Sequence, residues 1–127
     1  VYVMYLLDTH AIIWYVSGND KLSPTARKIM ETKRCFFSFA SLWEIAIKQA
    51  KGSLQFDIDI PRLKSVLENE EFIYLPPTEY DAEAIKSLPD IHRDPFDRLL
   101  IAQAIENDLT IVTTDSKIPS YKVKTIW

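Results

Sequence analysis

The feature that most constrains the fold is an alternation along the chain between short apolar runs and longer segments with helical patterning. Short apolar runs bounded by polar or turn-forming residues are typical of strands buried on both faces. Several of the longer segments carry helix-end signals: Ser23 before Pro24, Thr78 at the start of one, and Gly52 after another. We predict strands at residues 3–7, 34–37, 72–75, 110–113 and 122–126, and helices at 9–17, from Ser23-Pro24, and at 38–51, 61–70, 78–88 and 95–107.

This alternation predicts the fold class. Strands that alternate with helices form a parallel sheet with helices on both faces, which is a three-layer α/β/α sandwich with a central, mainly parallel sheet. The 127 residues suffice for one such core and are too few for two, so we expect a single domain over residues 1–127. In such sheets, functional sites form at the carboxyl ends of the strands, near a switch in strand order.

Composition excludes several classes of function. Gly18 and Gly52 are the only glycines, so neither glycine-rich phosphate-binding motif can be written. The single cysteine, Cys35, excludes an internal disulfide framework and a cysteine-based zinc site. No apolar run approaches the ~20 residues of a membrane span, and residues 1–20 contain no Lys or Arg, so we expect a cytoplasmic protein with no membrane contact.

The net charge of −3 argues against a protein that coats nucleic acid through a basic surface alone. It leaves open an enzyme that meets a polyanion through bound cations. Such an enzyme needs acidic ligands, and the chain carries acids at positions where this architecture builds sites.

Two of these acids follow predicted strands. Asp8 comes directly after the first strand, and Asp115 comes two residues after the strand at 110–113. Glu44 lies in the middle of a helix whose neighbours are mostly apolar. Each acid alone also has a structural interpretation: an aspartate in a turn or at a helix cap, or a pair between Glu44 and Lys48 at i, i+4.

A fourth acid, Asp97, lies near the start of the last helix. There Asp94 can cap the helix, Pro95 can be its first residue, and Asp97 suits the positive end of the helix dipole. The functional alternative makes Asp97 a ligand aimed at the sheet edge, with Asp94 as a cap or a support. Basic side chains near the acids could position phosphates without reading sequence: Lys48, Lys51, Arg93, Arg98 and Lys117.

The four acids indicate a function only when they are considered together, because as a group they could hold a divalent cation. Mg²⁺ and Mn²⁺ prefer carboxylate oxygens. One or two such ions held by Asp8, Glu44, Asp97 and Asp115 can activate a water and stabilise the leaving oxygen in phosphodiester cleavage. We therefore expect a metal-dependent nuclease.

Four segments carry a resemblance to a known family: Leu6-Leu7-Asp8-Thr9-His10, residues 38–48 around Glu44, residues 92–104 from His92-Arg93-Asp94-Pro95-Phe96-Asp97-Arg98 onward, and Thr113-Thr114-Asp115. Over essentially its full length the chain resembles PIN-domain proteins of the VapC type. These are the toxin half of bacterial and archaeal toxin–antitoxin pairs.

The resemblance implies a PIN-like sandwich, Mg²⁺- or Mn²⁺-dependent endoribonuclease activity on RNA, a homodimer, and a tight complex with a small antitoxin that inserts a peptide near the active site. It assigns the catalytic and metal-binding acids to Asp8, Glu44, Asp97 and Asp115. Thr9 and Thr114 match the hydroxyl positions that orient the acids, and Asp94 could replace or assist Asp97. From their proximity to the acids, Lys48, Arg93 and Arg98 are the expected RNA contacts.

Other classes remain to be weighed. A receiver-like phosphoacceptor or a haloacid-dehalogenase-like phosphatase would need further acids beside Asp8, where the chain has Thr9 and His10. An RNase H-like nuclease begins with an antiparallel meander. The non-enzymatic alternative is a catalytically silent PIN-fold module that binds a partner protein, which the presence of all four acids disfavours. Five further residues have mainly structural interpretations: Trp14, Phe39, Trp43, His10 and His92. For the two histidines, catalysis is a lesser option.

Overall fold

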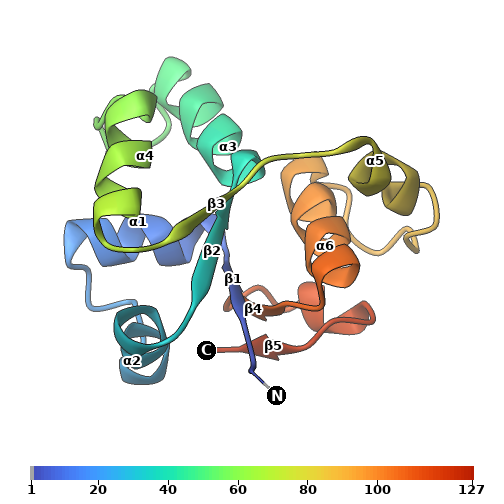
Figure 1. Ribbon diagram of the computed structural model, residues 1–127. Coiled ribbons are helices and arrows are strands. Elements are labelled where there is room, and N and C mark those ends of the chain that lie inside the picture. The colour runs from blue at the N-terminus through green and yellow to red at the C-terminus, as the bar shows by residue number, and fades with distance from the viewer. Residues whose placement is uncertain (1) are drawn as a thin grey trace.

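The computed structural model describes residues 2–127, which form a five-stranded sheet with helices on both faces (Figure 1). The strands lie in the order β3-β2-β1-β4-β5, and every neighbouring pair is parallel. This confirms the predicted α/β/α class. The strands are β1 (Tyr5–Leu7), β2 (Cys35–Ser38), β3 (Ile73–Leu75), β4 (Thr110–Val112) and β5 (Thr125–Ile126).

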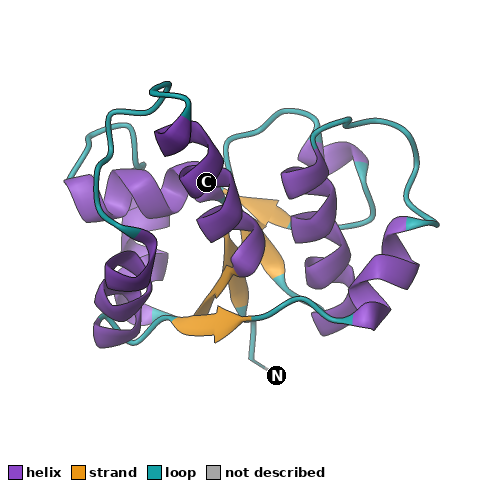
Figure 2. Ribbon diagram, turned by 90° about the horizontal axis from the view of Figure 1, so that it is seen from above, coloured by secondary structure: helices purple, strands orange, loops and turns teal. Residues whose placement is uncertain are grey.

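Two hydrophobic clusters lie on opposite faces of the sheet. In β1, successive side chains point to opposite faces, so Leu6 packs with the α6 side and Leu7 with the α1–α4 side. Both leucines are fully buried. Figure 2, seen from above, shows the strands between the two sets of helices. The helices are α1 (Thr9–Ser17), α2 (Pro24–Thr32), α3 (Phe39–Ala50), α4 (Ile60–Asn69), α5 (Glu79–Ile85), α6 (Pro95–Asn107) and the short 3₁₀ helix η1 (Ile118–Ser120).

Most helix boundaries follow the capping signals. The Ser23 side chain accepts a hydrogen bond from the Ala26 N–H at the start of α2, and Gly18 ends α1 in the left-handed region at φ 66°. The prediction for α5 is wrong at its end: the helix stops at Ile85 instead of residue 88. Residues 86–88 instead make i to i−3 hydrogen bonds, which tighten the chain into turns before Pro89.

The sheet order places a switch point between β1 and β4. From β1 the chain adds β2 and then β3 on one side, whereas β4 and β5 lie on the other side. At such a point the connections leave the carboxyl ends of neighbouring strands in opposite directions and open a crevice. Within residues 2–127, no helix is long and apolar enough to cross a membrane.

Candidate active site

A cavity of about 270 Å³ opens at the carboxyl edge of the sheet, beside the ends of β1 and β4. The structure brings all four predicted acids into this cavity from distant parts of the chain, together with the predicted supporting residues Asp94 and Thr114 and the predicted phosphate contact Lys48. The lining residues are Asp8, His10, Glu44, Lys48, His92, Asp94, Asp97, Thr114 and Asp115.

Asp8 is buried and is held by two hydrogen bonds. It follows β1, is only 7% exposed, and caps α1 by accepting the Thr9 N–H on Oδ1 at 2.7 Å. Its Oδ2 accepts the Thr113 hydroxyl at 2.6 Å. Burial raises the pKa of Asp8, although these two hydrogen bonds favour the ionised form. The carboxylate is therefore fixed in position at the end of the strand.

Glu44 reaches the cavity from α3 and is 5% exposed. Its Oε2 lies 2.7 Å from Lys48 Nζ, one helical turn further on. The hydrogen bond to Glu44 raises the pKa of Lys48, so the lysine stays charged. The predicted i, i+4 pair is thus present, and both of its members also line the cavity.

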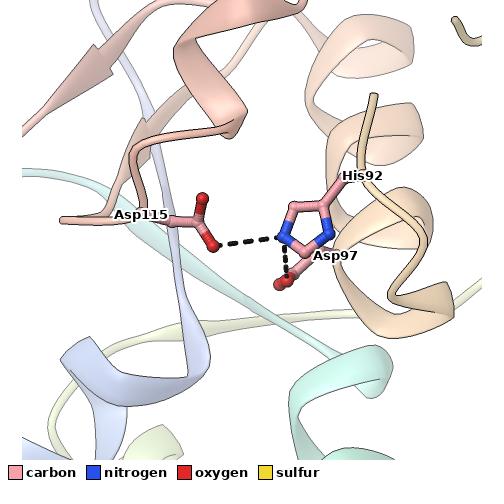
Figure 3. Close-up of side chains that lie close together, drawn as sticks. All are labelled: His92, Asp97 and Asp115. Carbon is pink, nitrogen blue, oxygen red and sulfur yellow. Dashed lines mark hydrogen bonds and ion pairs between the residues drawn. The ribbon is translucent and has the colours of Figure 1, made fainter. Parts of the chain in front are cut away.

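His92, Asp97 and Asp115 form a second group across the cavity (Figure 3). His92 Nε2 lies 2.8 Å from Asp97 Oδ2 and 3.1 Å from Asp115 Oδ2. We call these three residues the outer group, and Asp8 with Glu44 the inner pair.

The two acids of the outer group have opposite electrostatic surroundings. Burial, together with the negative charges of Asp8, Asp94, Glu44 and Asp115, raises the pKa of Asp97 to about 8. Burial would also raise the pKa of Asp115, but the Lys117 N–H and His92 outweigh it, and the net effect is to lower that pKa.

The chemistry of these side chains fits a divalent cation. Five carboxyl groups, those of the four predicted acids and of Asp94, line one small cavity. Burial and the repulsion of these neighbours raise the pKa of Asp97, so full ionisation requires a compensating positive charge. Carboxylate oxygens are the donors that Mg²⁺ and Mn²⁺ prefer. In the outer group, one candidate ligand atom from each residue lies within 4.8 Å of the others.

The hydroxyl that orients Asp8 is one that the sequence did not single out. Thr9, predicted to orient an acid, donates its hydroxyl to Ser41 Oγ at 2.9 Å instead. Thr114 lines the cavity, but the bond to Asp8 comes from Thr113. A signal existed in the sequence, because the predicted strand at 110–113 places Thr113 at its carboxyl end.

The other supporting residues divide between the site and the scaffold. Asp94 is the N-cap of α6, accepting the Phe96 and Asp97 N–H groups, and it also lines the cavity. Arg98 donates to four backbone carbonyls and does not line the cavity. Arg93 is exposed and lies outside the cavity lining. Contact of either arginine with RNA stays a prediction.

Comparisons with known proteins agree with this architecture. A profile of the PIN domain matches residues 5–124. Ribonuclease VapC22 of Mycobacterium tuberculosis is 28% identical over 119 residues, which cover 92% of this chain and 91% of that protein.

Two solved structures are similar in fold. A crystal structure of VapBC2 from Rickettsia felis, bound to a DNA fragment from its promoter, superposes with a TM-score of 0.71 at 13% identity over 98% of both chains. A toxin–antitoxin complex from Klebsiella pneumoniae gives a TM-score of 0.67 at 17% identity, over 97% of this chain and 96% of that one.

Proposed function

This chain belongs to the PIN-domain family, and we propose that it is a metal-dependent endoribonuclease that acts as the toxin of a type II toxin–antitoxin pair. One observation carries the proposal: Asp8, Glu44, Asp97 and Asp115 line a single cavity at the switch point of the sheet. The likeness to Ribonuclease VapC22 supports RNA as the substrate.

We assign the binding of Mg²⁺ or Mn²⁺ to the four acids. A bound ion would supply Lewis acidity, which would lower the pKa of a water molecule and stabilise negative charge on the leaving oxygen of a phosphodiester. Asp8 and Glu44 present fixed carboxylates, because each has a partner at 2.6 or 2.7 Å that restrains its rotation. Lys48 Nζ supplies a positive charge at the cavity, suited to attract the phosphate of the substrate.

The proposed partners are a small antitoxin protein and a second copy of this chain. The similar solved structures include complexes named as toxin–antitoxin or VapBC assemblies, which supports the antitoxin. The exposed aromatic side chains of Phe39 and Trp43 on α3, 39% and 42% exposed, are the candidate contacts for a homodimer.

A cleavage assay tests the enzymatic part. The full chain is incubated with total RNA and with Mg²⁺, Mn²⁺ or EDTA, beside Asp8→Asn and a matched control, Asp57→Asn, which changes an exposed aspartate outside the cavity. We expect cleavage with either metal, none in EDTA, none by Asp8→Asn, and the parent rate for Asp57→Asn. Equal cleavage by Asp8→Asn would refute the site assignment.

The same samples address the silent binding module. A chain of that kind would neither cleave RNA nor bind Mn²⁺, yet would still form a complex with its partner. A Mn²⁺ titration of the parent protein therefore separates the two functions.

A further inference from the structure

His92 is held at its backbone N–H and at both ring nitrogens, and its side chain lines the cavity. Its backbone N–H donates to the Tyr121 hydroxyl at 2.6 Å, and its Nδ1 accepts the Asp94 N–H at 3.3 Å. Its Nε2 lies against Asp115 and Asp97 at 3.1 and 2.8 Å. The side chain is 12% exposed. Such a restrained ring has a defined orientation, so the role of each nitrogen can be assigned from its neighbours.

The neighbours of the two nitrogens assign the proton. A neutral imidazole carries one N–H and one acceptor nitrogen, and Nδ1 accepts from Asp94. The proton therefore sits on Nε2, which donates to Asp115 Oδ2 and lies close to Asp97 Oδ2. A histidine that ligates a metal has the reverse arrangement: the ligating nitrogen is bare and the other nitrogen donates an N–H to an oxygen.

We propose that His92 is a positioning residue that holds Asp97 and Asp115 together through its Nε2–H, and that a divalent cation shared by these two acids must displace this contact to bind. His92 thereby restrains metal affinity instead of supplying a ligand. This inference rests on the metal dependence of the proposed function.

The physical basis is a competition for the same oxygens. Asp97 and Asp115 both lie against His92 Nε2 in a cavity that Asp8 and Glu44 also line, so the ionised forms of these two acids repel each other. One N–H between them offsets part of this repulsion. A cation offsets more of it, but the Nε2–H must first give up the same oxygen atoms. The cost is about one hydrogen bond.

The test measures Mn²⁺ binding to the full chain by calorimetry or by electron paramagnetic resonance. His92→Ala removes the N–H, and His92→Asn replaces the ring with an amide too short to bridge both acids. Asp57→Asn is the control, because Asp57 is exposed and lies outside the cavity lining. Thermal unfolding in EDTA is recorded for each protein.

We expect both His92 variants to bind Mn²⁺ about threefold to tenfold more tightly than the parent, which corresponds to one hydrogen bond that binding no longer breaks. Their unfolding midpoints in EDTA should fall by about 2 to 6 °C. Asp57→Asn should leave the Mn²⁺ affinity at the parent value. If His92→Ala does not fold, His92→Asn decides the result.

Weaker Mn²⁺ binding by the His92 variants would make His92 a ligand and overturn the inference. Unchanged binding with a lower unfolding midpoint would leave only a packing role and also overturn it. A parent protein that binds no Mn²⁺ would refute both this inference and the metal dependence. Mn²⁺ binding that tightens as expected, in a protein that cleaves no RNA, would support the inference and refute the nuclease.

Discussion

The two sides of the cavity hold their acids in different ways. The inner pair is nearly inaccessible, with Asp8 at 7% and Glu44 at 5% exposure, and each acid has its own partner in Thr113 or Lys48. The side chains of Asp97 and Asp115 in the outer group are 14% and 29% exposed and share one imidazole.

The two sides also differ in what surrounds their acids. The inner pair is positioned by the end of a strand and by a helix whose packing fixes both residues. In the outer group, burial and the neighbouring acids disfavour the ionised form of Asp97 and raise its pKa to about 8. The inner pair is therefore the more buried half of the proposed metal site, and Asp97 gives the outer group its response to pH.

The largest expected effect comes from removing an inner acid. Asp8→Asn should lower the rate of RNA cleavage by at least about 100-fold, because a fixed charge that stabilises the reacting centre is lost. Its unfolding midpoint should stay near the parent value or rise, because burial disfavours the charged form of Asp8. Cleavage rates and thermal unfolding of the same samples check this. A large fall in the midpoint would mean that Asp8 serves the fold first.

A smaller effect is expected from the partner of Asp8. Thr113→Val removes the hydroxyl that donates to Oδ2 and should lower Mn²⁺ affinity or activity about tenfold to 100-fold. Thr113→Ser should restore most of the loss. Thr9→Val is the comparison, because the Thr9 hydroxyl donates to Ser41. A greater loss in Thr9→Val than in Thr113→Val would contradict the assignment of the orienting hydroxyl.

The outer group should respond to pH in the presence of a chelator. The folded pKa of Asp97, about 8, lies above its ordinary value of 3.8, so the folded state binds its proton more tightly than the unfolded state. This contribution to stability is complete below about pH 4 and is lost as the pH rises through about 8. Asp97→Asn should remove this trend. It should gain at least about 1 kcal/mol relative to the parent between about pH 5 and about pH 9.

Urea unfolding in EDTA across that pH range measures the difference. A constant difference between Asp97→Asn and the parent at all pH values would mean that Asp97 is ionised throughout. Asp57→Asn, in which an exposed aspartate is changed, is the control for the loss of one carboxylate.

The smallest expected effects come from two arginines near the outer group, Arg98 and Arg93, whose substitutions should change the free energy of unfolding by different amounts. Arg98 donates to the carbonyls of Ile85, Leu88, Pro89 and His92, so Arg98→Ala should lower the free energy of unfolding by about 1 to 3 kcal/mol. Arg93→Ala changes an exposed side chain and should alter it by less than about 0.5 kcal/mol.

A measurement of RNA binding tests whether Arg93 contacts the substrate. Arg93→Ala should weaken RNA binding by a few-fold at low salt, with the difference shrinking at high salt because exposed charges are screened. Equal RNA binding by Arg93→Ala and the parent would remove Arg93 from the proposed RNA surface.

The alternation of elements, the class of fold and the four acids followed from the sequence. Strand and helix patterns are local, because a short apolar run between turn residues, or a Ser-Pro start, acts over a few positions. Asp8 and Asp115 could be placed at one edge because the carboxyl ends of parallel strands meet there. The end of α5 was misplaced because its last turn depends on local turn geometry and on contacts with Arg98.

The partners of the acids were decided by tertiary structure. The β1–β4 register pairs Leu7 with Val112, so the next position beside Asp8 is Thr113 and not Thr114. His92 meets Asp115 only because the loop before α6 lies against the end of β4. Sequence spacing gives the face of an element on which a side chain lies, but strand order and register determine which distant side chain it meets.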